Sequence, residues 1–277
     1  MIKIKVEGTV YQLVSDIKFR GGTSDCYILR KVGMGNALQP LFYLFKKLKP
    51  SVAANCAYRG LLKREYQLGR SLQNMNVVGY KEYIEAEQGI VMNYVSGCTL
   101  EEFLTADAAK AADAAYFGRN GLCRVAKFCF QILSGLKAMH DRRFFHCDIT
   151  SRNILMTDVT LDAVIIDLGM AHCMGDGALL GTTNHCCAPE MQTGKADGRS
   201  DIFMFGQILQ RITSSLPVFA PIVARCTAPD PESRFQSVDD VAAAILNLCA
   251  SEQNVTQTLL LHSYYITCFP QPYSCAV

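Results

Sequence analysis

The residues best suited to chemistry lie in the middle of the chain, between two short apolar segments. Asp148 precedes Asn153 by five residues, and Asp167 follows the strand-like run 164–166. One carboxylate can orient a hydroxyl group, while the other carboxylate and the amide oxygen can bind a cation. Oxygen ligands suit a hard cation such as Mg²⁺, which is bound through few protein groups and the phosphates of a substrate. The sequence therefore predicts a magnesium-dependent site.

This stretch resembles the catalytic loop of eukaryotic-type protein kinases, H-x-D-x-x-x-x-N over residues 146–153, followed by a D-F-G-type motif at residues 167–169. The resemblance implies that the protein transfers the γ-phosphate of ATP to a hydroxyl group of a protein substrate. It also implies that Asp148 accepts the hydrogen of that hydroxyl. Asn153 and Asp167 would hold Mg²⁺, which neutralises charge on the phosphates.

Four other residues of this loop bear on its chemistry. His146 is expected to pack under the loop rather than act as a base. Cys147 replaces the family's usual arginine, so the chain resembles kinases that are not switched by loop phosphorylation through that arginine. Thr150 stands where serine/threonine kinases usually have a lysine, whereas Arg152 matches a form common in tyrosine kinases and can supply the missing positive charge. Hydroxyl specificity stays open, with serine/threonine preferred.

A helix predicted over residues 124–140 must position this loop, because it ends directly ahead of it. Apolar residues recur there at the spacing of one helical face: Val125, Phe128, Cys129, Ile132, Leu133, Leu136 and Met139. In protein kinases such a helix leads into the catalytic loop. Further buried helices are expected over residues 202–212 and 238–248.

The first third of the chain has strand character on both sides of residues 19–25. Gly21 and Gly22 predict a turn at which backbone N–H groups can approach a ligand closely. In the kinase resemblance this turn covers the ATP phosphates, with Gly21, Gly22, Ser24 and Cys26 near the nucleotide. Only the middle one of the family's three glycines is kept, so an ordinary hairpin turn is the alternative.

A third strand is predicted over residues 41–48, which includes Lys46 and Lys47. A lysine on this strand can bind the α- and β-phosphates as a compact charge, and the register of the family's V-A-I-K motif selects Lys46. Glu65 lies nineteen residues further on, in a predicted helix over residues 60–72. The family has a glutamate there that pairs with the lysine. The resemblance implies a Lys46–Glu65 pair, with a solvated strand end as the alternative.

A strand-like run at residues 89–95 resembles the hinge segment of kinases. The resemblance makes Met92 the gatekeeper and assigns the backbone of Asn93 and Val95 to hydrogen bonds with adenine. Leu155, just after the catalytic loop, is expected in the same nucleotide site.

Three later motifs fit the same family in the right order. They are A-P-E at residues 188–190, a D-x-W-x-x-G-like motif at residues 201–206 and D-P-x-x-R at residues 230–234. Asp201 is expected to hydrogen-bond the backbone of the catalytic loop, and Arg234 to pair with Glu190. Arg234 follows Asp201 by only 33 residues, so much of the family's αG region must be missing. A Gly-Thr contact with the catalytic aspartate falls on Thr182 or Thr183.

The composition indicates a compact folded protein. Charged residues make up 19% of the chain and hydrophobic residues 50%, and a net charge of +2 gives no basic footprint for nucleic acid. No signal segment and no run long enough for a membrane span is visible. The 13 cysteines have no CxxC spacing, so reduced, mostly structural thiols are expected. We therefore expect a cytoplasmic protein, or one that acts in the cytosol of a host.

We therefore expect an α+β, two-lobed protein-kinase-like fold over residues 1–250. It would consist of a small β-rich N-lobe to about residue 92, a hinge at 93–97 and a larger, mostly helical C-lobe. Residues 251–277 would form a short strand, a partner-binding segment or packing on the C-lobe. A pseudokinase acting as a nucleotide-binding scaffold is the alternative function, because of the altered glycine turn and Thr150. A small-molecule kinase fits less well, because such enzymes lack the three later motifs.

Overall fold

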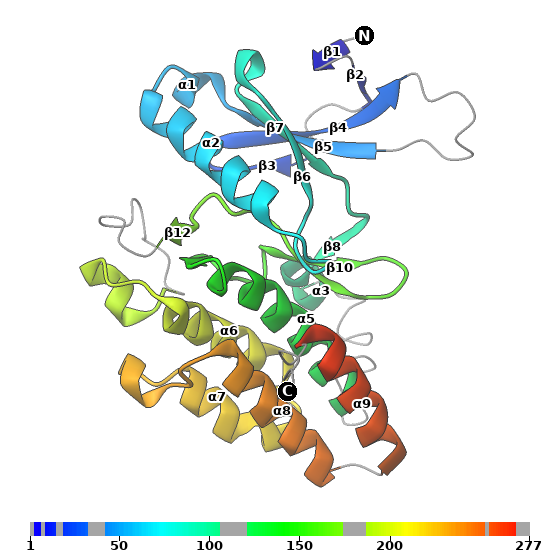
Figure 1. Cartoon of the computed structure of the whole chain (residues 1–277), viewed down its shortest axis with the longest axis vertical. Helices are drawn as coiled ribbons and strands as arrows, with labels where there is room; N and C mark the ends of the chain where they lie inside the picture. Colours follow the sequence, from blue (N-terminus) through cyan, green and yellow to red (C-terminus); the bar gives the residue numbers. More distant parts are fainter. Residues whose placement is uncertain are drawn as a thin grey trace, which may run out of the picture. The chain divides into compact units, whose positions relative to one another are not determined.

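The computed structural model describes residues 3–6, 9–14, 19–32, 42–105, 121–173, 187–252 and 255–269. It divides into two compact units (Figure 1). The first comprises Met1–Gln73 and Val78–Ser96, and the second Asn74–Val77 and Gly97–Val277. The first unit is built on an antiparallel sheet, and the second mostly on helices.

Among the described residues, seven strands form the sheet of the first unit, in the order β1-β2-β4-β5-β7-β6 with β3 beside β4. The strands are β1 (Lys3–Val6), β2 (Thr9–Leu13), β3 (Phe19–Arg20), β4 (Ser24–Val32), β5 (Phe42–Leu48), β6 (Tyr80–Ile84) and β7 (Gly89–Asn93). Phe45 in β5 lies opposite Val91 in β7 and Tyr27 in β4. Because side chains alternate along each strand, such opposed residues build one apolar layer with Tyr11 and Leu29.

Two helices, α1 (Pro50–Ala53) and α2 (Cys56–Ser71), follow β5. Helix α2 begins four residues before the predicted start at residue 60, because the Asn55 side chain caps it by accepting the Ala57 N–H at 2.9 Å. The helix packs on β6. A Cβ atom at Gly69 would lie 2.2 Å from the Tyr80 ring, so only glycine permits this close approach.

Helix α5, most of whose residues are buried, is the centre of the second unit. The helices are α3 (Leu100–Thr105), α5 (Leu122–His140), α6 (Gly198–Ile212), α7 (Ala220–Cys226), α8 (Val238–Glu252) and α9 (Val255–Cys268). Helices α6, α8 and α9 contact α5, and Figure 1 shows α8 and α9 alongside it. The helices predicted over residues 124–140, 202–212 and 238–248 are confirmed as α5, α6 and α8. Apolar residues at helical spacing give each of them a face to bury.

Two small antiparallel ladders flank the catalytic loop, residues 146–153. One is the sheet of β8 (Gly97–Thr99), β10 (Ile154–Thr157) and β11 (Ala163–Ile165), and the other pairs β9 (Phe144–Phe145) with β12 (His172–Cys173). Asn76 joins this unit through β11, because its side chain donates to the Ala163 carbonyl at 2.9 Å and its carbonyl accepts the Ile165 N–H at 2.7 Å.

The tail contains helix α9, so the suggestion of a strand there is wrong. Leu261 and Phe269 are 5% and 1% exposed, and the rings of Tyr265 and Phe269 contact Phe130 of α5 at 5.5 and 6.4 Å. These tail residues recur every four positions, which places them on one helical face. This part of the tail therefore packs on helix α5 of the second unit, which is one of the three expected alternatives.

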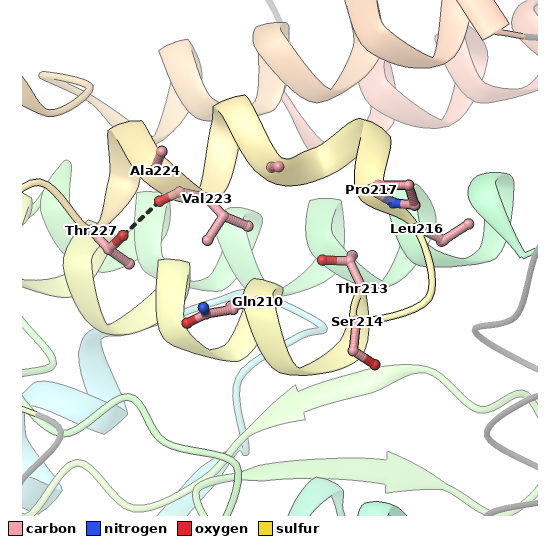
Figure 2. Close-up of a pocket in the computed structure, with 9 residues that line it drawn as sticks. Gln210, Thr213, Ser214, Leu216, Pro217, Val223, Ala224 and Thr227 are labelled. Atoms are coloured by element: carbon pink, nitrogen blue, oxygen red, sulfur yellow. Dashed lines mark hydrogen bonds between the residues drawn. The ribbon is translucent and has the colours of Figure 1, made fainter.

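The region between α6 and α8 is short, as predicted, and contains the seven-residue helix α7 and two single-turn 3-10 helices. A hollow of about 500 Å³ lies between α6 and α7. Figure 2 shows Gln210 on α6 facing Val223 on α7 across it, with Thr213 just after the end of α6. None of the predicted site residues lines this hollow.

The predicted Arg234–Glu190 pair is present. It links the A-P-E motif at residues 188–190 to the turn that precedes α8. The guanidinium is buried, and its nitrogens lie 2.8 and 2.9 Å from the two Glu190 oxygens. Its other three N–H groups donate to the carbonyls of Ala228, Arg199 and Pro229, so all five guanidinium donors are satisfied. Burial alone would raise the pKa of Glu190, but hydrogen bonds from Arg234 and Ser200 lower it below its usual range.

Replacing Arg234 by methionine leaves the Glu190 carboxylate without its cation. We expect Arg234→Met to lower the free energy of unfolding by about 3–5 kcal/mol, measured by urea denaturation. The control is Glu232→Gln, which removes an exposed carboxylate paired with Arg199 and should cost less than about 1 kcal/mol. Equal losses in the two variants would contradict the importance of the buried pair.

The lowered pKa of Glu190 makes its contribution to stability depend on pH. A carboxyl whose folded pKa is depressed stabilises the fold above the pKa of the unfolded chain, about 4.3 for glutamate, and loses this contribution as pH falls. The stability difference between the wild type and Glu190→Gln should therefore be constant above about pH 5 and narrow below about pH 4.3. Denaturant titrations across this range measure it, and a difference that is independent of pH would refute the assignment.

Candidate active site

A buried ion pair in the first unit joins β5 to α2. Lys46 and Glu65 are 9% and 3% exposed, and Lys46 Nζ lies 2.9 Å from both carboxylate oxygens of Glu65. The predicted contact is therefore present. Lys47 forms a half-exposed pair with Glu87 at 2.6 Å, so the description of a solvated strand end applies to Lys47 and not to Lys46.

Tyr80, the first residue of β6, is part of this pair although the sequence did not point to it. Its hydroxyl donates to Oε1 of Glu65 at 3.0 Å, and its side chain is buried. A buried carboxylate needs several donors to satisfy its lone pairs. This need was the one signal that a further side chain would donate to Glu65. Nothing in the spacing of the chain showed that Tyr80 would supply one of them.

The glycine turn, residues 21–23, connects β3 to β4 and has both of its glycines exposed. The Gly21 N–H donates to the Ser24 carbonyl at 2.8 Å, which closes the predicted hairpin. Cys26 lies directly opposite Lys46 in the β4–β5 register. Ser24 is two residues away on the same strand, so Ser24, Cys26 and Lys46 share one face of the sheet.

The predicted hinge begins at the end of β7. Met92 is 4% exposed and lies opposite Leu44 of β5. The Asn93 N–H donates to the Gly79 carbonyl at 2.8 Å, so at Asn93 the carbonyl and not the N–H is the group that can bond a ligand. The assignment of the Val95 backbone to adenine stays a prediction. The first compact unit ends at Ser96, one residue after the partly exposed Val95.

Asp148 and Asn153 are brought together at the two ends of the tight catalytic loop. The Asn153 side-chain nitrogen donates to the backbone carbonyl and to Oδ2 of Asp148, both at 2.8 Å. The Asn153 amide oxygen therefore faces away from Asp148 and is available to a cation. The Ile166 N–H donates to the Asn153 carbonyl at 2.9 Å, which holds Asp167, the next residue, near Asn153.

Asp167 is exposed and has a φ of 64°, a left-handed conformation that aspartate tolerates better than most residues. One of its oxygens accepts the Gly169 N–H at 2.9 Å. An exposed carboxylate beside an amide oxygen is the all-oxygen donor set that fits Mg²⁺. In the described part of the chain, no group of three His, Cys, Asp or Glu residues could hold a metal without a substrate.

The backbone of the catalytic loop is held by Asp201, as predicted. This fully buried carboxylate accepts the N–H groups of His146 and Cys147 at 2.9 and 2.8 Å, and its Oδ2 lies 2.8 Å from Nε2 of His140. Burial alone would raise the pKa of Asp201, but the hydrogen bond from His140 and nearby charge lower it. His146 is buried and accepts the Asp148 N–H at 3.2 Å, so it packs under the loop as expected.

A second anchor of the loop was not predicted. Ser151 donates to Glu101 of α3, and Arg211 at the end of α6 donates to both residues. Hydrogen bonds from Arg211 and Ser151, with a smaller effect of the Arg152 charge, lower the pKa of Glu101 to about 2. Arg152 itself is exposed, and Leu155 is partly buried in β10 opposite Val164.

Some predicted residues lie outside the described part of the chain, namely Thr182, Thr183 and Cys186. Every cysteine within the described ranges is a free thiol, including Cys147, Cys173 and Cys187. Cys147 is buried, and this burial raises the pKa of its thiol, which disfavours the reactive thiolate. No helix among the described residues is long and apolar enough to cross a membrane.

A sheet-based unit carrying a Lys–Glu pair and a helical unit carrying an Asp–Asn–Asp set define the two-lobed fold of protein kinases. The family model for the protein kinase domain matches residues 31–247, so the chain belongs to the protein kinase family. The expected α+β, two-lobed fold is confirmed. The kinase domain of Mycobacterium tuberculosis PknI has a similar structure, with a TM-score of 0.63 and 19% identity over 86% of this chain and 96% of that one.

Several curated bacterial relatives are serine/threonine-protein kinases by name. SCO3848 of Streptomyces coelicolor, described as a probable member of that class, is 25% identical over 86% of this chain and 40% of its own length. PknB of Mycobacterium leprae is 21% identical over 86% of this chain and 43% of its own length. The chain thus spans about two fifths of the length of these relatives.

Asp201 provides a test of how the catalytic loop is held. Asparagine keeps the shape of Asp201 but removes its charge and replaces one acceptor oxygen by a donor, which faces the donors of the loop. Asp201→Asn should lower the free energy of unfolding by about 1–3 kcal/mol, measured by urea denaturation. Asp230→Asn, at an exposed helix cap, should be nearly neutral because both residues cap well. A neutral Asp201→Asn would contradict the assigned role.

Proposed function

We propose that this protein is a serine/threonine protein kinase that transfers the γ-phosphate of ATP to a hydroxyl group of a protein substrate. The observation that carries the proposal is the pairing of Asn153 with Asp148, which fixes a carboxylate in the loop of a protein kinase family member. The printed names of the curated relatives support serine/threonine specificity. The identity of the substrate does not follow from these observations.

For ATP binding, we assign the phosphates to Lys46 and the glycine turn. Glu65 and Tyr80 hold the Lys46 ammonium by their hydrogen-bonded network. Backbone N–H groups at Gly22 and Ser24 would approach the phosphates, as turns rich in glycine allow, while the Gly21 N–H is bonded to the Ser24 carbonyl. Adenine would contact Met92, Val95, Cys26 and Leu155 and donate to the Asn93 carbonyl.

For metal binding, we assign Mg²⁺ to the Asn153 amide oxygen and the Asp167 carboxylate. When bound, Mg²⁺ neutralises negative charge on the phosphates. The positive φ of Asp167 and its bond to the Gly169 N–H keep the carboxylate exposed.

For the transfer itself, Asp148 would accept the hydrogen of the substrate hydroxyl and direct its oxygen toward the phosphate. The Asn153 side chain donates to Oδ2 of Asp148 and thereby orients this carboxylate. Arg152, exposed four residues after Asp148, would supply positive charge that Thr150 does not. Cys147 carries no charge to receive a phosphate, so activity would not require phosphorylation read by this position.

The test is phosphate transfer from γ-labelled ATP with Mg²⁺ to generic protein acceptors. The wild type should label serine or threonine, and Asp148→Asn and Lys46→Ala should each reduce the rate at least about a hundredfold. Lys47→Ala and Asp230→Asn change the same residue types at sites that no step uses, and both should retain the wild-type rate. A folded, ATP-binding wild type that transfers no phosphate would contradict the proposal and favour a nucleotide-binding scaffold.

A further inference from the structure

Lys49, the residue after β5, contacts the glycine turn at several points. Its backbone N–H donates to the Thr23 carbonyl at 2.9 Å. Its side-chain ammonium donates to the Gly21 carbonyl and lies 3.9 Å from an oxygen of Asp25. One residue therefore holds the carbonyl groups on both sides of Gly22.

Lys49 reaches the turn from the face of the sheet opposite to Lys46. In the β4–β5 register Cys26 lies opposite Lys46, and Asp25 lies opposite Lys47. Because side chains alternate along a strand, Asp25 and Lys47 share one face, and Cys26 and Lys46 share the other. The approach of Lys49 to Asp25 places its ammonium on the face of Lys47, so Lys49 is not a second phosphate ligand beside Lys46.

The turn itself has little that would keep it in one conformation. Gly22 has open space around it, whereas a Cβ atom at Gly21 would lie 2.8 Å from the Ser24 carbonyl oxygen. Glycine has the largest range of backbone conformations to lose, and two adjacent glycines make the turn especially mobile unless other contacts fix it. Within the described residues, these contacts are the Gly21–Ser24 hydrogen bond and those made by Lys49.

Fixing the two carbonyls also fixes two N–H groups. In a planar trans peptide the C=O of one residue and the N–H of the next point in opposite directions. The Gly21 and Thr23 carbonyls face Lys49, so the Gly22 and Ser24 N–H groups point away from it. Neither N–H is the donor in the bonds that the turn makes with Lys49 and within itself. Two N–H groups fixed in a turn are a suitable site for an anion.

We propose that Lys49 is a positioning residue that holds the glycine turn in the conformation that binds the phosphates of ATP. The proposal rests on the proposed kinase function. It assigns to Lys49 the ordering that the glycine turn, with one of the family's three glycines, does not provide by itself.

The test compares the affinities of the 277-residue chain for ATP and for adenosine, which lacks phosphates, by calorimetry. Lys49→Ala should weaken ATP binding about tenfold, as expected for the loss of a charged hydrogen bond, while adenosine affinity stays within about twofold of the wild type. Lys49→Arg keeps the charge and the donors and should retain ATP affinity. Lys47→Ala, on the same face but without contact to the turn, is the matched control.

Kinetics give a second readout, since the KM for ATP should rise about tenfold in Lys49→Ala while kcat at saturating ATP changes little. Unchanged ATP affinity, an equal loss for ATP and adenosine, or failure of Lys49→Arg to retain affinity would overturn the proposal. A wild type that binds ATP but transfers no phosphate would overturn the kinase function alone, because the affinity comparison still measures the turn. A wild type that binds no ATP would overturn both.

Discussion

The carboxylate of Asp201, which has no exposed surface, accepts hydrogen bonds from two consecutive backbone N–H groups of the catalytic loop and contacts the ring of His140. Asp201 lies on α6, and its partners lie on two other segments, the end of α5 and the start of the loop. A buried donor left unsatisfied costs about 1–3 kcal/mol, so alternative loop conformations that break these bonds are disfavoured. The positions of Asp148 and Asn153 depend on this constraint, because they follow directly along the same loop.

Two further buried ionic groups, Arg234 and Glu65, are also hydrogen-bonded at several atoms. Arg234 uses all five of its donors, and Glu65 accepts from both Lys46 and Tyr80. A buried ion pair adds stability only when its remaining polar atoms are bonded as well. These hydrogen bonds therefore do more than pair opposite charges. Each set forms only when the helices and strands that carry the residues lie in one register.

The sequence was sufficient for contacts that a short motif specifies. The Lys46–Glu65 pair and the Arg234–Glu190 pair were both expected from the motifs that carry these residues, and both are present. It was not sufficient for Tyr80 or Lys49, because their partners depend on where α2 packs on β6 and how β5 pairs with β4. The prediction of a strand in the tail was wrong for another reason. The tail's tyrosines and isoleucine favour strands locally, but the apolar face of α5 selects the helical spacing of Tyr265 and Phe269.

Cys147 connects the strain of the loop with its regulation. It has a φ of 60°, a left-handed conformation that is unfavourable for a residue with a Cβ atom. The hydrogen bond from its N–H to Asp201 offsets this cost, and its buried, uncharged side chain offers no cation to an incoming phosphate. An arginine at this position would need an anion to compensate its charge on burial. With cysteine there, internal hydrogen bonds hold the loop, so we expect its order not to depend on a phosphate at this point.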